Sequence, residues 1–367
     1  MRILHVLNDV SDRGNGIVNA AVDMAIGQAR LGHSVGLVSS GGGHESLLSS
    51  AGVELFRIDH MRRPVNLLKS LRTFGQQVSQ FRPDVVHVHM RAGLVVAWLW
   101  SKCYGYALVA HIQNVHDRES VLMGLAQRAI VVSESVGLTM RKMGIPKRKI
   151  RVVLNRTLYS ARLPQLSKIA PAPLQRPSIV SVCGMYQRKG IGELIVAFEQ
   201  IAGECSNTHL YLVGDGPDRG TFEAQANASH FCDRIHFEGF QGNPQSFMLA
   251  ADVFVLASRR DSFPLVLIEA RQAGCAIVAS SVDGIPEGLD GGRAGVLVEP
   301  QNPDALAAAL RRMLMDENER QTWQQRATHG IEAFSVSEMV QEVLNVYREV
   351  IPAARVLEPS KTLQSWS

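Results

Sequence analysis

Several features are scarce in this 367-residue chain, and each absence narrows the classes of protein to which it can belong. No run of about 18 apolar residues occurs, so we expect no membrane-spanning helix. The five cysteines form no Cys-x-x-Cys pair and no disulfide framework, which favours a reducing compartment. The net charge of +4 is too small to indicate a nucleic-acid partner. The amino-terminal segment lacks the length and cleavage site of a signal peptide, so we expect a cytoplasmic protein.

Short apolar strands alternate with helical patterns in two successive series along the chain. This alternation predicts an α/β fold of two Rossmann-like domains, each a doubly wound parallel sheet, that face each other across a cleft. Prolines cluster between the two series and mark a linker, because proline cannot continue a helix or an inner strand. The expected segments are an N-terminal domain (1–163), a linker (164–177), a C-terminal domain (178–334), a helix returning to the N-terminal domain (335–351) and a tail (352–367).

The segment from Asp261 to Glu269 carries the clearest signal of a ligand site. It follows an apolar run at 251–257, which is typical of a buried parallel strand, and it leads into a helix that ends at Gly274. Backbone N–H groups at such a strand-to-helix turn favour an anion. Carboxylates beside an anion cannot bind it themselves, but they suit sugar or ribose hydroxyls. The combination therefore indicates a site for a nucleotide sugar.

Three further loops follow predicted strands of the second domain. The loop that starts at Gly184 carries Arg188 and Lys189, whose charges suit a diphosphate. Gly214 opens a tight turn that allows close approach of a ribose or a base, and Phe240 is a candidate for stacking on a nucleobase. The alternatives at these positions are an exposed basic pair and a purely structural turn.

In the first domain, Gly16 lies in a glycine loop between the first strand and the first helix. Glycine there lets the backbone approach a phosphate or an acceptor closely, although a plain flexible turn is the alternative. Asn19 stands where a dinucleotide-binding fingerprint needs its third glycine, which argues against a nicotinamide cofactor.

Histidines occur near the carboxyl ends of two neighbouring predicted strands. His111 ends one of them, where a neutral imidazole can donate to a sugar hydroxyl or stabilise developing charge; a structural histidine is the alternative. His87 and His89 alternate to one face of the preceding strand, and we interpret both as structural. The spacing of these three and His116 matches no known ligand pattern, so no metal site is predicted.

Basic residues gather in one short segment of the N-terminal half. We expect this cluster to contact anionic lipid headgroups or a lipid-linked acceptor at the inner face of the cell membrane, the alternative being a solvated helix end and loop. The members of the basic cluster are Arg141, Lys142, Lys147, Arg148, Lys149 and Arg151.

The ordered set of these motifs resembles the family 4 retaining glycosyltransferases of the GT-B fold. The resemblance covers about residues 1–350 and is strongest over 178–300. There the loops at 184–190, 214–217 and 237–240, the strand at 251–258 and the acid-x7-Glu segment occur in the order typical of the family. Each motif is weak alone, whereas the ordered set is specific.

The resemblance implies a role for each candidate residue. Asp261 contacts donor-sugar hydroxyls, Glu269 holds the ribose, and Lys189 neutralises the leaving diphosphate. His111 faces the donor sugar, and Gly16 belongs to the loop that closes over phosphate and acceptor. The remaining donor-binding candidates are Gly184, Gly214, Phe240 and the backbone N–H groups of Ser262, Phe263, Leu265 and Val266.

The implied reaction is retaining transfer of a sugar from a nucleotide diphosphate sugar, with uridine as the favoured base, to a hydroxyl of a glycan or lipid-linked acceptor in polysaccharide or glycoconjugate biosynthesis. No Asp-x-Asp signature occurs in a suitable loop, so neither a metal nor another cofactor is expected.

Several positions depart from the family pattern, and two of them bear on catalysis. Asp261 stands where the family usually has glutamate, and Met185 stands where it has arginine, a charge that Arg188 is expected to replace. These departures keep open the alternative of a catalytically weak subunit that binds a nucleotide sugar. A nucleotide-sugar epimerase of the same fold, which would need its own acid/base set, is a separate alternative.

Overall fold

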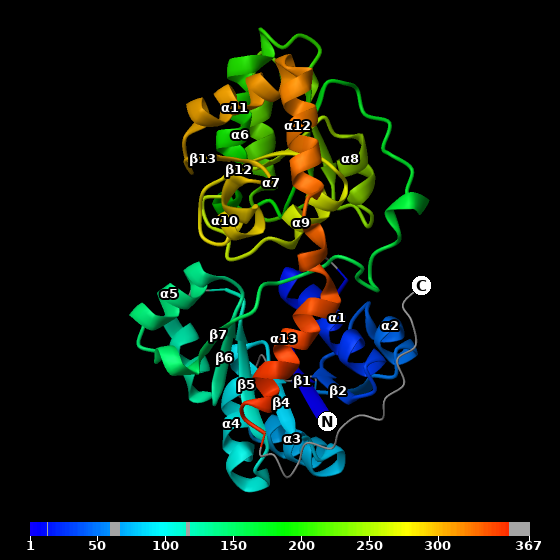
Figure 1. Ribbon diagram of the computed structural model, residues 1–367, viewed down its shortest axis with the longest axis vertical. Coiled ribbons are helices and arrows are strands. Elements are labelled where there is room, and N and C mark those ends of the chain that lie inside the picture. The colour runs from blue at the N-terminus through cyan, green and yellow to red at the C-terminus, as the bar shows by residue number, and fades with distance from the viewer. Residues whose placement is uncertain (13, 59–66, 115–117, 352–367) are drawn as a thin grey trace. The chain divides into compact units, whose positions relative to one another are not determined.

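The computed structural model describes residues 1–351 except residues 13, 59–66 and 115–117, and the side chains of 67–70, 118 and 119 are likewise outside the description. The chain divides into two compact units (Figure 1). Unit 1 comprises Met1–Leu154 and the chain from Val336, and unit 2 comprises Asn155–Ser335. The boundary therefore precedes residue 163, where the sequence suggested the end of the first domain.

Unit 1 is built on a seven-stranded parallel sheet with the order β3-β2-β1-β4-β5-β6-β7. The strand order reverses between β1 and β4, which is where ligands bind in open sheets of this kind. The strands are β1 (Arg2–Val6), β2 (Ser34–Ser39), β3 (Glu54–Arg57), β4 (Val85–Val88), β5 (Ala107–Ile112), β6 (Arg128–Val131) and β7 (Ile150–Val152).

The helices of unit 1 lie between these strands in the sequence, except the last, which joins the unit from the end of the chain. They are α1 (Gly16–Arg30), α2 (Glu45–Ser50), α3 (Leu67–Phe81), α4 (Arg91–Tyr104), α5 (Glu134–Lys142) and α13 (Val336–Arg348), with short 3₁₀ turns at Arg118–Leu125 and Lys147–Lys149. Helix α1 begins where the Asn15 side chain accepts a hydrogen bond from the Ile17 N–H at 3.0 Å, a typical N-cap. The six-residue α2 was not predicted, because so short a helix shows no clear apolar period.

The last helix, α13, packs on unit 1 beside α1 (Figure 1). Its apolar side chains, including Met339 and Val343, share a buried core with Ile3 and Val85 of the sheet. Gly27 in α1 makes the close approach of the two helices feasible, since a Cβ at this position would lie 2.7 Å from a methyl carbon of Val340.

Unit 2 is built on a six-stranded parallel sheet with the order β10-β9-β8-β11-β12-β13. Buried helical side chains cover both of its faces, so the predicted α/β class with two doubly wound sheets is confirmed. The strands are β8 (Ser178–Val182), β9 (His209–Val213), β10 (Ile235–Gly239), β11 (Val253–Leu256), β12 (Ala276–Ser280) and β13 (Val296–Val298). The helices are α6 (Ile191–Ala202), α7 (Arg219–Asn227), α8 (Gln245–Ala250), α9 (Leu265–Gln272), α10 (Ile285–Gly288), α11 (Pro303–Met315) and α12 (Glu317–Thr328).

The proline-rich segment 164–177, expected as a linker, is bonded to unit 2. The Ala172 N–H donates to the Ser246 carbonyl oxygen at 2.9 Å. The Arg176 guanidinium forms an ion pair with Asp252, whose side chain is nearly buried. This part of the segment is therefore a fixed edge of unit 2.

Candidate functional site

In unit 2 the strand order reverses between β8 and β11, so the loops after these strands meet at the carboxyl edge of the sheet. Lys189 ends the helical turn after β8, and Asp261 lies in the loop after β11. Lys189 Nζ donates to Asp261 Oδ2 at 2.5 Å, and the two side chains are only 11% and 10% exposed. The edge at which a ligand is expected thus carries a largely desolvated ion pair.

The loop around Asp261 is fixed by a second carboxylate. Asp283 Oδ2 accepts from the Asp261 backbone N–H at 2.9 Å and from Arg260 Nε at 2.9 Å. Ser258 Oγ donates to Asp261 Oδ2 at 3.3 Å, so the oxygen that meets Lys189 has a second donor. These contacts hold the Asp261 carboxylate in place.

Backbone contacts tie the loops after β8 and β11 together. Gly190 has a left-handed φ of 66°, and a Cβ there would lie 1.9 Å from the Ala257 carbonyl oxygen. Only glycine adopts this left-handed conformation without strain and also leaves room for the carbonyl oxygen. The Arg259 N–H also donates to the Arg188 carbonyl oxygen at 2.8 Å. The position of Lys189 is consequently set by the backbone on both sides.

The turn that contains Gly214 packs directly against the start of the loop after β8. With φ at 136°, Gly214 leaves no room for a Cβ, which would lie 2.0 Å from the Cys183 carbonyl oxygen. The Gly214 N–H donates to the Gly239 carbonyl oxygen at 2.8 Å. Phe240 follows Gly239 and is 53% exposed. The structure therefore brings the predicted residues Gly184, Gly214 and Phe240 into neighbouring loops.

Met185 belongs to the core of unit 2 and is 1% exposed. Its N–H donates to the Asp215 carbonyl oxygen at 2.9 Å, which joins two of the loops. The methionine is therefore a packing residue, and its side chain does not stand in for an arginine at the surface. Arg188 is partly exposed, with its guanidinium carbon 5.4 Å from the centre of the Tyr186 ring.

Glu269 lies on α9 and is 8% exposed. Gln245 on α8 donates to Glu269 Oε2 at 3.4 Å, so this carboxylate has a polar neighbour from another helix. The Phe263 ring lies 6.3 Å from that of Phe334 and is buried, which leaves only its backbone for the predicted contact with a ligand.

The start of α9 follows directly after Asp261. Ser262 is buried, and Pro264 occupies the N-cap position without an N–H of its own. The N–H groups of Leu265 and Val266 are in the first turn, where no carbonyl one turn earlier in the helix can accept from them. These groups carry the positive end of the helix dipole.

The two predicted residues of unit 1 occupy different environments. His111 lies near the carboxyl end of β5 and is 1% exposed; burial lowers its pKa to about 3, so the imidazole is neutral. Neither ring nitrogen has a hydrogen-bond partner among the described residues. Gly16 is exposed at the start of α1, and a Cβ there would meet no atom within 4 Å, so local packing does not require a glycine. His116, which the sequence also suggested, lies outside the described residues.

A buried polar network beside His111 was not anticipated from the sequence. His5 on β1 donates through Nε2 to Gln28 Oε1 of α1 at 2.8 Å, since an amide oxygen only accepts. His5 Nδ1 lies 3.0 Å from His89 Nε2. His87 Nδ1 lies 2.6 Å from the Tyr347 hydroxyl of α13, to which Gln28 Nε2 donates at 3.3 Å. Partners separated by 319 positions leave no local signal in a sequence.

Burial keeps the histidines of this network neutral. It lowers the pKa of His5 to about 4 and lowers the pKa of His87 and His89 well below the usual value, with neighbouring imidazoles adding to the effect for these two. The sequence placed His87 and His89 on one strand; His87 lies in β4, whereas His89 follows its last residue, Val88. The register adds His5 opposite His87 on β1.

The basic cluster is only partly available for a ligand. Arg151 forms an ion pair with Glu349 at 2.7 Å, and Lys149 Nζ donates to the Gly124 carbonyl oxygen at 2.7 Å. The other members, Arg141, Lys142, Lys147 and Arg148, are exposed. Within the described ranges, no helix has both the length and the apolar character needed to cross a bilayer.

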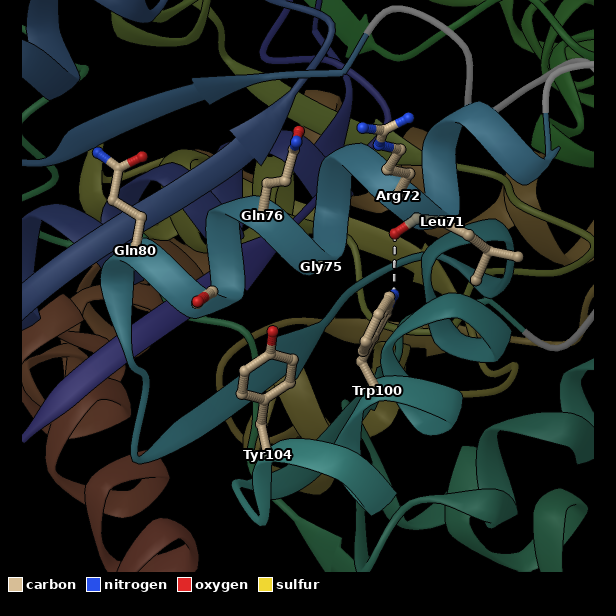
Figure 2. A pocket seen from close by; sticks show the side chains of 8 residues that line it. Leu71, Arg72, Gly75, Gln76, Gln80, Trp100 and Tyr104 are labelled. Atoms are coloured by element: carbon tan, nitrogen blue, oxygen red, sulfur yellow. Dashed lines mark hydrogen bonds between the residues drawn. The ribbon is translucent and has the colours of Figure 1, made fainter.

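A surface groove of about 680 Å³ lies along the seam between α3 and α4 (Figure 2). Trp100 Nε1 donates to the Leu71 carbonyl oxygen at 2.9 Å. Gly75 leaves the space that the indole ring occupies, because a Cβ at this position would lie 2.5 Å from the ring. The groove is therefore the outer edge of a helix–helix contact, and none of the residues predicted to bind a donor lines it.

Two protein-family models match the chain. Residues 14–155 match the model described as Glycosyltransferase Family 4, and residues 164–330 match that described as Glycosyl transferases group 1. The chain is 27% identical to the N-acetyl-alpha-D-glucosaminyl L-malate synthase of Bacillus anthracis over 288 aligned residues. The aligned region covers 73% of this chain and 75% of that enzyme. It is 31% identical over 194 residues to the lipopolysaccharide core biosynthesis glycosyltransferase LpsD of Rhizobium meliloti, about half the length of each protein (52% and 54%).

Solved structures share the same fold. Anabaena Alr3699/HepE in complex with UDP and glucose superposes with a TM-score of 0.80 at 19% identity, over 95% of this chain and 99% of that one. A sucrose-phosphate synthase from Thermosynechococcus elongatus superposes with a TM-score of 0.78 at 19% identity, with the same coverage. At this level of identity the superpositions show the fold alone, which is two parallel-sheet domains.

Proposed function

Because the chain belongs to the family 4 glycosyltransferases of the GT-B type, we propose that it transfers a sugar from a nucleotide diphosphate sugar to a hydroxyl group of a glycan or lipid-linked acceptor, with retention of the anomeric configuration. UDP is the proposed nucleotide, and the pathway is the synthesis of a polysaccharide or glycoconjugate. The transfer needs no metal ion and no other cofactor in this proposal.

The contact between Lys189 and Asp261 is the observation that carries the proposal. Departure of a diphosphate concentrates negative charge beyond the sheet edge, and a positive charge held there in advance lowers the barrier. Lys189 supplies a full charge, and the first turn of α9 supplies the positive end of a dipole. Asp261 accepts from the sugar hydroxyls while keeping Lys189 oriented.

The proposed reaction needs no nucleophile from the protein. The bond between the anomeric carbon and the diphosphate oxygen breaks, and its electron pair leaves with the diphosphate. The acceptor oxygen forms the new bond on the same face of the sugar, and its proton passes to the leaving phosphate oxygen. Glu269 holds the ribose hydroxyls, and neutral His111 faces the donor sugar.

The names of similar proteins guide the choice of ligands. The neighbouring HepE structure contains UDP, and LpsD is named for lipopolysaccharide core biosynthesis. A uridine donor and a glycan or lipid-linked acceptor are thus the first to test. The exposed Arg141, Lys142, Lys147 and Arg148 would draw the protein to an anionic membrane surface, where such an acceptor resides.

The test is a thermal-shift screen of nucleotide diphosphate sugars and free nucleoside diphosphates in the presence of a chelator. A ligand at 100 times its Kd should stabilise the protein by about 2.7 kcal/mol. We expect a UDP-sugar to raise the Tm of the wild type and to have no effect on Glu269→Ala. The stabilising donor is then incubated with candidate acceptors, and NMR of the product gives its anomeric configuration.

Each outcome separates the proposal from a rival. Donor consumption without an acceptor, yielding an isomeric nucleotide sugar, would identify an epimerase. Binding without turnover on any acceptor would favour a binding subunit, which the burial of Met185 at the family's arginine position makes the main rival. Absence of any shift would refute the proposed donor site.

A further inference from the structure

On one buried face of the unit 1 sheet, the side chains are aliphatic at first and become histidines toward the carboxyl ends of the strands. Ile3 and Val85 on this face pack in the aliphatic core, whereas His5 and His87 follow them two residues later in matching register. His89 follows after two more residues. All three imidazoles are at most 3% exposed. Burying an imidazole costs free energy unless its nitrogens are hydrogen-bonded or bind a ligand, whereas an aliphatic side chain has no such requirement. The buried imidazoles here therefore need ligands or hydrogen-bond partners.

We propose that His5, His87 and His89 form a binding site for a divalent transition-metal ion, with Zn²⁺ as the best-fitting ion. One ring nitrogen from each of the three lies within 4.8 Å of the others, a spread that a central ion can close by small side-chain movements. Three neutral imidazoles are a ligand set that Zn²⁺ favours, with a water molecule in the fourth position. The spacing argument against a metal site omitted His5, which the fold adds through strand pairing.

The oxygen partners of His5 and His87 match the second shell of a metal site. Ligating histidines donate their other ring N–H to an oxygen, which fixes the tautomer. Gln28 Oε1 accepts from His5 Nε2, so His5 Nδ1 carries a lone pair; it accepts from His89 Nε2 at 3.0 Å, a hydrogen bond that the ion would replace. The Tyr347 hydroxyl oxygen lies 2.6 Å from His87 Nδ1, and His87 Nε2 is buried without a partner among the described residues. Gln28 also donates to Tyr347, so one hydrogen-bonded chain orients two of the ligands.

A metal ion at this position would join four elements of unit 1. His5 lies on β1, His87 lies on β4 and His89 directly follows β4, and the oxygen partners of His5 and His87 come from α1 and α13. Metal binding would consequently stabilise the packing of the last helix against the sheet. Lys189 and Asp261 of the proposed sugar transfer lie in unit 2, whereas His111, which the proposal places facing the donor sugar, has its ring 5.3 Å from that of His87.

The primary test measures zinc retained by the untagged full chain. The protein is stripped with a chelator, equilibrated with one equivalent of ZnCl₂, dialysed against metal-free buffer and analysed for elemental zinc. We expect about one zinc per chain in the wild type and a small fraction of that in His5→Gln and His89→Gln. The matched control is His236→Gln, which breaks the His209–His236 pair (also 3.0 Å apart) in unit 2 and should retain zinc. A wild type without zinc, or histidine variants that retain as much as the wild type, would overturn the proposal.

A second variant covers the case in which the histidine variants do not fold. Tyr347→Phe keeps all three ligands and the ring, and it removes only the hydroxyl beside His87 Nδ1. Competition with a chromophoric chelator should show a 10–100-fold loss of zinc affinity. An unchanged affinity in Tyr347→Phe would contradict the proposed second shell and the site built on it.

Discussion

Lys189 Nζ lies 2.5 Å from Asp261 Oδ2, which brings together two residues that are 72 positions apart at the switch point of the unit 2 sheet. The pair is largely shielded from water, so its electrostatic effect on a bound diphosphate exceeds that of a surface charge. Each partner also needs the other, because an unpaired charge in this position would be costly.

The first prediction concerns Lys189→Ala. Loss of the positive charge should lower kcat by about 10²- to 10³-fold, the usual effect of removing one stabilising group from a developing anion. Initial rates of sugar transfer at saturating donor measure this. Arg311→Ala is the matched control, because it removes an equal charge from an exposed ion pair with Glu204 on the surface of unit 2. A loss of kcat in Arg311→Ala equal to that in Lys189→Ala would show that total charge, rather than the position of Lys189, matters.

The second prediction concerns Glu269→Gln. The amide preserves the volume of the side chain but loses the ionised acceptor that the ribose hydroxyls need, which corresponds to about 1.5–3 kcal/mol, or about 10- to 100-fold in donor affinity. Calorimetric titration with the free nucleoside diphosphate measures this loss directly. The Tm of the variant without ligand is measured beside that of the wild type, so that a loss of donor affinity is distinguished from a loss of stability. Unchanged affinity would remove Glu269 from the donor site.

Local sequence patterns predicted the parts of the site but not their contacts. The strands and loops were recognisable because continuous apolar runs alternate with helical periods. The meeting of Lys189 with Asp261 depends on the pairing of β8 with β11, which no local pattern specifies. For the same reason His5 was overlooked: only its register opposite His87 shows its role.

Burial was the second property that the sequence could not supply. From the sequence, Met185 was interpreted as the loss of a positive charge at an arginine position, whereas the structure shows that its side chain belongs to the core. Arg271 illustrates the reverse case. It is fully buried and donates to the carbonyl oxygens of Ala327 and Gly288, although an arginine on a helix is ordinarily expected at the surface.

The third prediction concerns the pH dependence of stability. Burial lowers the pKa of His33 to about 4, with further lowering by the positive charges of the amino terminus and Arg348. The folded state therefore binds fewer protons than the unfolded state between pH 6.5 and pH 4, and stability is lost as the pH falls through this window. His33 should account for about 1–2 kcal/mol of that loss at pH 5.

Urea unfolding of wild type and His33→Gln at pH 7.5 and pH 5 isolates this contribution, because all other histidines are common to both proteins. The variant should lose less stability than the wild type on acidification. Equal losses in the two proteins would mean that His33 has the same proton affinity in both states.

The last prediction concerns Gly190, whose backbone holds Lys189 in position. Gly190→Ala introduces a Cβ at a left-handed φ of 66° and 1.9 Å from the Ala257 carbonyl oxygen, so the loop after β8 has to move. Unfolding free energy should fall by at least about 2 kcal/mol, and the Lys189–Asp261 contact should be lost with it. Gly220→Ala in α7 is the control, because a Cβ there meets nothing within 4 Å and alanine favours a helix by up to about 1 kcal/mol. Urea denaturation compares the two variants. Equal stability in both would show that the loop adapts to a side chain, and Lys189 would then be held by Asp261 instead of by the backbone.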